Sequence, residues 1–200
     1  METQRRTQAD RTAATRAALV AAARPRFADR GYAGVGTTEI AEAAGVTRGA
    51  LYHQFPDGKA ALFVAVLEAV EAELTERIAG VLADGATDAL DALRLGAAAF
   101  IDAAAEPEVR RIVLLDGPVV LGWSAWRDLM ARYGLGLTEA ALAAGMADGS
   151  IRQGPVATLA QVLLGAIDEA ALLVAESDDP ATTRAEVDEV VGLLLEALRP

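Results

Sequence analysis

The sequence predicts an all-α protein of about nine helices, with one domain over residues 1–57 and a larger one over residues 58–200. Three observations support this prediction. Apolar residues recur every three to four positions along most of the chain, which is the period of a helix with one buried face. Glycines, prolines and short polar runs interrupt these stretches at intervals typical of globular proteins. The length of 200 residues is also enough to enclose a substantial core.

The first helix is expected over residues 10–30, where an apolar face runs to Phe27 and Gly31 follows the last turn. Pro25 lies inside this helix. A proline in a helix interior removes one backbone hydrogen bond and costs roughly 3 kcal/mol. We therefore expect a kink or a break at Pro25.

A glycine-centred turn between two short helices is the most distinctive feature of the chain. Thr37 or Thr38 is expected to cap the first of these helices, because a threonine hydroxyl can accept a bond from a free backbone N–H. Gly45 lies where that helix ends in a left-handed residue. Thr47 is the next cap, and the second helix is expected over residues 48–55. This is the helix-turn-helix pattern, whose second helix enters the major groove of DNA.

The outer face of the second helix has residues suited to DNA. Arg48 can donate two hydrogen bonds to guanine, and small Gly49 and Ala50 allow close approach to a base or a thymine methyl. Tyr52 and His53 can donate to phosphates. Helix N-termini also favour a phosphate. The residues expected to contact DNA are Thr37, Thr38, Thr47, Arg48, Gly49, Ala50, Tyr52, His53 and Lys59.

The run TTEIAEAAGVTRGALYHQFPDGKAAL, residues 37–62, resembles the N-terminal domain of the tetracycline-repressor (TetR) family of transcriptional regulators. The similarity covers about residues 10–70. It implies an N-terminal three-helix DNA-binding domain and a C-terminal helical domain for ligand binding and dimerisation. Spacing alone leaves another possibility open, because helix-turn-helix shapes also occur in proteins that do not bind DNA.

One long helix is expected from Lys59 to about Ala83. Its first turn lies beside the DNA-binding residues and its far end enters the larger domain, so it can transmit a change between the two. A further helix is expected over residues 88–105, and then a short segment that Gly117 and Pro118 close.

Residues 119–148 are helical in tendency, but four glycines loosen them. Helices of this kind, lined with aromatic residues, can enclose an apolar ligand. The alternative is that the aromatic residues are ordinary core. The candidate ligand contacts are Trp123, Trp126, Met130 and Tyr133.

The last two helices are expected from Pro155 to about Glu176 and from Pro180 onward, with Asp179 as a cap. Both are too apolar for the surface of a monomer and indicate a partner. The family resemblance implies that these helices pair with those of a second copy in a four-helix bundle; intramolecular core is the alternative. The residues expected at the dimer interface are Leu159, Leu163, Ile167, Ala170, Val174, Val187, Val191, Leu194 and Leu195.

The net charge of −11 is unevenly distributed. Residues 1–60 hold eight arginines and one lysine against six acids, a charge of +3, and residues 61–200 hold nine bases against 23 acids, a charge of −14. This asymmetry suits a protein whose first domain binds DNA while the second is kept away from it. Residues 1–8 form a polar arm; a solvated tail is the default interpretation and a minor-groove arm the alternative.

We therefore predict a ligand-responsive transcriptional repressor. It is expected to bind double-stranded DNA at an inverted-repeat operator as a homodimer, and to be released when an unidentified small apolar or amphipathic molecule occupies the C-terminal domain. A DNA-binding regulator controlled by a protein partner is the first alternative. The polar N-terminus and the lack of about 18 continuous apolar residues predict a cytoplasmic protein with no membrane partner.

A helical enzyme is the second alternative. Asp116, Arg127, Asp168 and Glu169 could form an acid–base site. No nucleophile elbow, phosphate loop or metal cluster accompanies them in the sequence. With no cysteine and a single histidine, disulfides and multi-histidine zinc sites are excluded. We expect no enzymatic activity, no metal and no cofactor.

Overall fold

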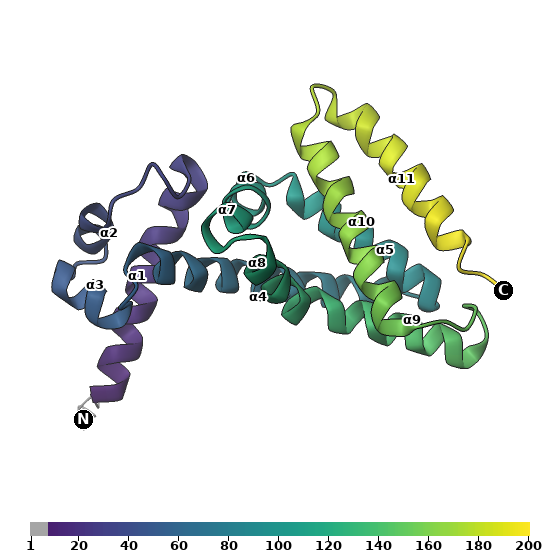
Figure 1. Cartoon of the computed structure of the whole chain (residues 1–200), viewed down its shortest axis with the longest axis horizontal. Coiled ribbons are helices and arrows are strands. Elements are labelled where there is room, and N and C mark those ends of the chain that lie inside the picture. The colour runs from purple at the N-terminus through teal and green to yellow at the C-terminus, as the bar shows by residue number, and fades with distance from the viewer. Residues whose placement is uncertain (1–7) are drawn as a thin grey trace.

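The computed structural model of the protein describes residues 8–200. Within this range every regular element is a helix, and the helices form nine continuous runs, which confirms the predicted fold class. Most of the predicted polar arm lies outside the described residues. Figure 1 shows a smaller N-terminal group of helices, a larger C-terminal group, and one long helix that runs from the first into the second.

The N-terminal group consists of three helices that pack against one another and against the start of a fourth. These are α1 (Gln8–Arg30), α2 (Thr37–Ala43), α3 (Arg48–Gln54) and the long α4 (Lys59–Gly85). Among the largest fully buried side chains here are Leu19, Phe27, Ile40, Leu51, Phe55 and Phe63. The inward positions predicted for Leu51 and Phe55 are thereby confirmed.

The break predicted as one outcome at Pro25 does not occur, because α1 continues through this residue. Ala23 and Phe27, on either side of the proline, are fully buried in the N-terminal group. The Arg26 guanidinium adds a bond to the helix by donating to the Ala22 carbonyl oxygen at 2.7 Å. Tertiary packing therefore holds the helix together across the missing backbone bond.

The C-terminal group is centred on α5, which packs against the four helices α4, α9, α10 and α11. The bounds of its longer helices are α5 (Ala89–Ala104), α9 (Gly136–Asp148), α10 (Val156–Glu176) and α11 (Pro180–Glu196). Asp179 caps α11 as predicted, since its carboxylate accepts a bond from the Thr182 N–H at 3.3 Å.

Two helical runs in this group contain π-helical turns. The first comprises α6 (Pro107–Val109), η1 (Arg110–Asp116) and α7 (Gly117–Leu121), and the second comprises α8 (Trp123–Met130), η2 (Ala131–Leu135) and α9. The prediction that Gly117 and Pro118 close a segment is wrong. Gly117 has helical dihedral angles and Pro118 lies in the first turn of α7, where a proline is tolerated. The chain breaks at Gly122 instead, whose φ of 78° is left-handed.

Gly117 allows the indole of Trp126 to pack against the chain. A Cβ atom at position 117 would lie 2.8 Å from Trp126 Cδ1 and 3.1 Å from Leu67 Cδ1. The ring is fixed in this place because Trp126 is buried and its N–H donates to the Val113 carbonyl oxygen at 2.9 Å.

Gly117→Ala is expected to destabilise the protein by about 1–3 kcal/mol, because the added methyl group overpacks a fixed ring. Denaturant unfolding measures this change. The matched control is Gly80→Ala in α4, where no atom lies within 4 Å of the added Cβ. This control should stabilise by up to about 1 kcal/mol through helix propensity. Equal stability of the two variants would contradict the packing argument.

Candidate DNA interface and ligand cavity

Helix α3 is held by its N-cap and by the buried Leu51, and its outer face is exposed. The Thr47 hydroxyl oxygen accepts a bond from the Ala50 N–H at 3.1 Å, as expected of an N-cap. Gly45 has the predicted left-handed φ, at 67°. On the outer face Arg48 and Tyr52 are exposed, together with His53 and Gly49, while Ala50 is half-buried. The Arg48 guanidinium lies 5.8 Å from the centre of the Tyr52 ring, so these two side chains form one surface.

The start of α2 differs from the prediction by one residue. Gly36, rather than Thr37 or Thr38, is the N-cap. The Gly36 N–H donates to Glu39 Oε1 at 2.6 Å, and the other oxygen of this carboxylate accepts from Arg30 at 2.7 Å. The Glu39 carboxylate, rather than the expected threonine hydroxyl, thus accepts a bond from a free backbone N–H at the start of the helix. Both threonines remain in the first turn, with Thr38 exposed and Thr37 half-buried.

The Lys59 side chain holds the loop between α1 and α2. Its ammonium donates to the carbonyl oxygens of Tyr32 at 2.9 Å and Val35 at 3.0 Å, and it lies 4.1 Å from the centre of the Tyr32 ring. An ammonium has three N–H donors, so one is left for another acceptor such as a phosphate. The sequence indicated the position of Lys59 at a helix start but not these contacts.

A set of polar contacts, which we call the α1 joint, links α1 and the following loop to the C-terminal group. The Tyr32 N–H donates to Asp116 of η1 at 2.6 Å. Arg24 of α1 bonds both Glu73 of α4 at 2.6 Å and Glu108 of α6 at 2.7 Å. A movement of η1 or α6 must therefore either break these hydrogen bonds or move α1 with it.

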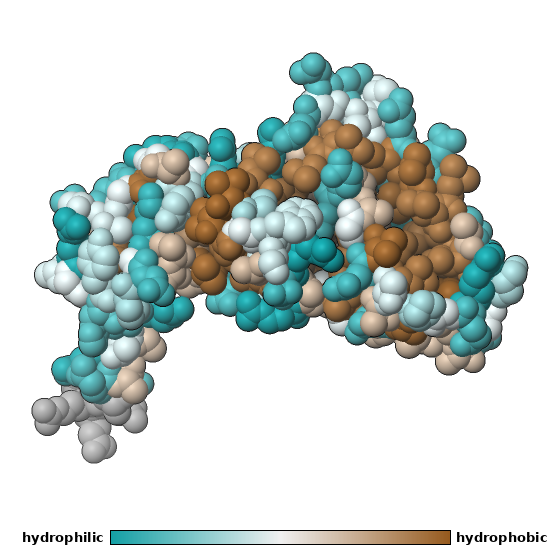
Figure 2. Space-filling model, in the orientation of Figure 1, coloured by the Kyte–Doolittle hydropathy of each residue, from teal (hydrophilic) through white to brown (hydrophobic). Residues whose placement is uncertain are grey.

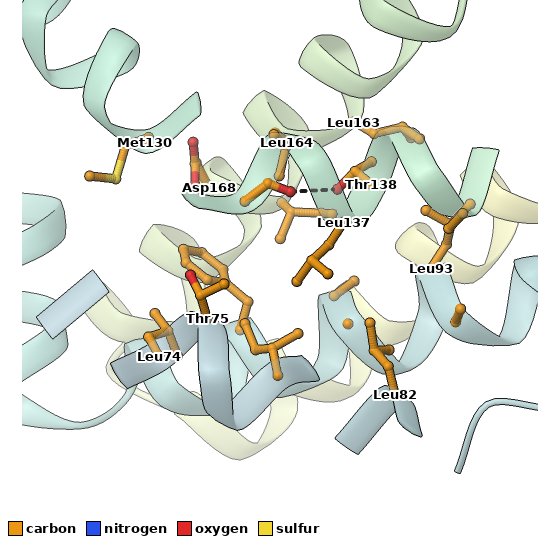
Figure 3. A pocket seen from close by; sticks show the side chains of 18 of the residues that line it. Leu74, Thr75, Leu82, Leu93, Met130, Leu137, Thr138, Leu163, Leu164 and Asp168 are labelled. Carbon is orange, nitrogen blue, oxygen red and sulfur yellow. Dashed lines mark hydrogen bonds between the residues drawn. The ribbon is translucent and has the colours of Figure 1, made fainter. Parts of the chain in front are cut away.

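A cavity of about 100 Å³ lies inside the C-terminal group. Side chains of α4, α5, α9 and α10 turn toward this space, with Asp168 among them (Figure 3). Its walls are mostly apolar, and Leu74, Leu137 and Leu164 are typical. Among its polar residues are Thr75, Thr138, Glu71 and Asp168. This is the composition of a small-molecule site, with apolar walls and a few polar groups.

Only Met130 of the four predicted ligand contacts lines this cavity. Trp126 is part of the core beside Gly117, and Trp123 is 63 % exposed. Tyr133 is half-buried and lies outside the cavity lining. The aromatic residues therefore did not locate the pocket, because its walls include leucines from five helices, whose spacing looks like ordinary core.

Two carboxylates face this apolar space. Glu71 is 4 % exposed, and its Oε1 has no hydrogen-bond partner among the described residues. Burial, followed by the charge of Asp168, raises the pKa of Glu71 to about 7. Burial also raises the pKa of Asp168 to about 6, although Arg127 of α8 partly offsets this effect. Within residues 8–200 no group of three or more histidine or acidic side chains could hold a metal ion.

Two segments of the chain match models of known protein families. Residues 19–66 match the family model described as "Bacterial regulatory proteins, tetR family", and residues 90–198 match "Tetracyclin repressor-like, C-terminal domain". The chain belongs to the TetR family. This DNA-binding transcriptional regulator is therefore not an enzyme, and the acid–base alternative built on Asp116, Arg127, Asp168 and Glu169 is set aside.

Solved structures extend the similarity to the whole TetR-family chain. A TetR-family regulator from Pectobacterium atrosepticum is 34% identical, with a TM-score of 0.82 over 97% of this chain and 98% of that chain. The structure of RolR with resorcinol is 21% identical, with a TM-score of 0.74 over 96% and 97%, and supports the fold. The regulator CymR of Pseudomonas putida is 43% identical over 77 residues, which span 38% of this chain and 37% of that protein.

The TetR-family chain also exposes an apolar face on its last two helices. Figure 2 shows hydrophobic surface gathered over the C-terminal group. Helix α10 has the length and composition of a membrane span, the one such helix among residues 8–200, but only 22% of its most apolar window is buried in the protomer. The buried side of α10 packs against α5, α9 and α11. The exposed side chains, here called the α10–α11 face, are Val162, Leu173, Val190, Leu193 and Leu194.

The predicted dimer residues mostly lie on the opposite sides of these helices. Leu194 is exposed at 46 %, and Leu159 and Ile167 are half-buried. The other six are largely buried inside the protomer and face its core rather than outward, which corrects their expected orientation: Leu163, Ala170, Val174, Val187, Val191 and Leu195. Both sides of α10 are apolar, so the hydrophobic pattern did not indicate which side faces outward.

Glu71→Gln is expected to stabilise this TetR-family regulator at alkaline pH. The pKa of Glu71 is raised from 4.5 to about 7, so the folded state binds the proton more tightly than the unfolded state does. Stability is therefore fully retained below about pH 4.5 and lost as pH rises through about 7, by about 3 kcal/mol in all. Denaturant unfolding should show a large advantage of the variant at about pH 8 and a small one at about pH 5.

The control for this experiment is Glu76→Gln, which changes an exposed carboxylate on the same helix. Its stability should stay within about 0.5 kcal/mol of the parent protein at both pH values. If Glu71→Gln shows no more stabilisation at alkaline than at acidic pH, the buried charge at position 71 has another compensation.

Proposed function

We propose that this TetR-family regulator is a repressor that binds an inverted-repeat operator as a homodimer and releases it when a small apolar or amphipathic molecule occupies the cavity. One observation supports this proposal above others: the single helix α4 begins in the N-terminal group beside α3 and lines the cavity farther along its length. We place the domain boundary at its start, between residues 57 and 58.

The proposed DNA contacts are grouped around the start of α3. Arg48 is the candidate for reading a guanine, since its guanidinium can donate two parallel hydrogen bonds to one base edge. Tyr52 and His53, with Thr47, Gly49 and Ala50, complete that surface, while Thr37 and Thr38 lie in the first turn of α2. For Lys59 we propose a phosphate contact through the one N–H that its two carbonyl partners leave available.

A homodimer through the α10–α11 face fits the exposed apolar side chains of these helices. Contiguous apolar surface of this kind marks an interaction site in a soluble protein. A two-fold dimer places two copies of α3 about one helical turn of DNA apart or somewhat more, and so requires an inverted repeat. Such a regulator acts on DNA, and we expect it to be cytoplasmic.

Release by a ligand follows if the occupied cavity favours another position of α4. A change in the separation of the two α3 helices lowers operator affinity without altering any single DNA contact. The ligand must then prefer the incompetent state by a few kcal/mol, since equal affinity for both states shifts nothing. The cavity favours a small molecule over a protein as the controlling partner, and RolR, a relative in fold, has been solved with resorcinol.

Titration of the purified protein against fragments of its own genome, at two salt concentrations, tests the proposal. Binding of one fragment in the nanomolar range, with a steep salt dependence and a footprint over an inverted repeat, is the expected result. Weak binding of all fragments alike would show that the helix-turn-helix does not select a sequence.

Arg48→Ala should weaken binding to the preferred operator by about 1–3 kcal/mol and reduce discrimination between operator variants, because a bidentate base contact is lost. Fluorescence anisotropy with the operator and its single-base variants measures both effects. Arg94→Ala, which removes an exposed arginine of α5, is the control for loss of charge alone. Unchanged affinity and ranking in Arg48→Ala would rule out this residue as the base reader.

Val162→Glu should convert the dimer into a monomer, because a charge in the centre of an apolar interface has no partner there. Sedimentation analysis reports the mass, and operator binding should weaken with it. Val119→Glu is a matched control, since Val119 is 82 % exposed on α7 and lies outside the α10–α11 face. A dimeric Val162→Glu would place the interface elsewhere.

A further inference from the structure

Glu71 is unusual among the residues of the cavity. It lies on α4, is almost wholly buried, and presents a carboxylate oxygen with no hydrogen-bond donor among the described residues. A buried carboxylate costs free energy unless a donor or a cation compensates it. Asp168 of α10 lines the same space and adds a second negative charge rather than a donor.

The nearby cations of the chain do not supply this compensation. Arg132 of η2 pairs with Glu68 at 3.7 Å. Arg127 lowers the pKa of Asp168 but is exposed, and it has no such effect on Glu71. Burial, then the charge of Glu68 and to a smaller extent that of Glu71, raises the pKa of the nearby Tyr133 hydroxyl. The electrostatic field in the cavity is therefore negative and is surrounded by apolar walls, which strengthens it.

We propose, on the basis of the proposed function, that the effector is an apolar molecule with a positively charged amine, and that Glu71 and Asp168 receive this amine. The apolar remainder packs against the leucines of α4, α9 and α10. A cationic N–H donor supplies both the missing hydrogen bond and the missing countercharge. A carboxylate of the same size would add further negative charge in a low-dielectric space, and an alcohol would supply a donor without charge.

Three molecules with one carbon skeleton test this assignment: 2-phenylethylamine, 2-phenylethanol and phenylacetate. Calorimetric titration of the full-length protein should show that the amine binds at least about tenfold more tightly than the alcohol, with phenylacetate the weakest. Glu71→Gln should reduce amine affinity by about tenfold or more and leave alcohol affinity nearly unchanged. Glu76→Gln, on the outside of α4, should bind all three as the parent protein does.

Any of three results would overturn the inference. The first is tighter binding of phenylacetate or the alcohol than of the amine, and the second is an amine affinity that Glu71→Gln leaves unchanged. The third is no amine binding up to the solubility limit of the amine. Because unfolding measurements on Glu71→Gln show whether the variant is folded, a loss of binding cannot be confused with a loss of structure.

Operator binding separates this inference from the proposed function. If the amine binds through Glu71 but the operator complex is unaffected at saturating amine, the ligand assignment stands and ligand-controlled release fails. If phenylacetate releases the operator and the amine does not, the regulator functions as proposed and the assignment of a cationic effector is wrong.

Discussion

Burial of α4 against both groups of helices is the constraint on which the rest of the structure depends. Lys59 at its start holds the loop after α1, and Phe63 packs against the Tyr32 ring at a centroid distance of 5.3 Å. Twelve residues beyond Lys59, or about 18 Å along the helix axis, Glu71 faces the cavity. A rigid helix with buried contacts at both ends cannot shift at one end without affecting the other.

The α1 joint limits the form that such a shift can take. Asp116 of η1 holds the backbone of Tyr32, and Arg24 connects α1 to both α4 and α6. These charged hydrogen bonds join α1 to the C-terminal group, so a shift of η1 or α6 that keeps them intact moves α1, and with it the N-terminal group as a unit. In the proposed function, a unit of this kind changes the distance between two recognition helices while each keeps its own geometry.

The parts of the fold that depend on local chemistry were predictable from the sequence. Gly45 and Thr47 end and begin helices because of their own backbone and side-chain preferences, and both do so in the structure. The start of α2 was missed by one residue because Glu39, not a threonine, satisfies it. The cavity was not predictable in the same way. Its walls come from side chains of several helices, and a leucine that lines a cavity has the same spacing as one that fills a core.

Both sides of α10 are apolar because one side lines the cavity and another is exposed on the α10–α11 face. Leu163 and Leu164 line the cavity on one side of this helix, together with Asp168, while Val162 and Leu173 are exposed on another. One helix thus separates the ligand space from the proposed dimer face. A charged ligand that binds Asp168 changes the electrostatic environment within one helix diameter of that face. Ligand occupancy would therefore act on the spacing of the two recognition helices through the interface as well as through α4.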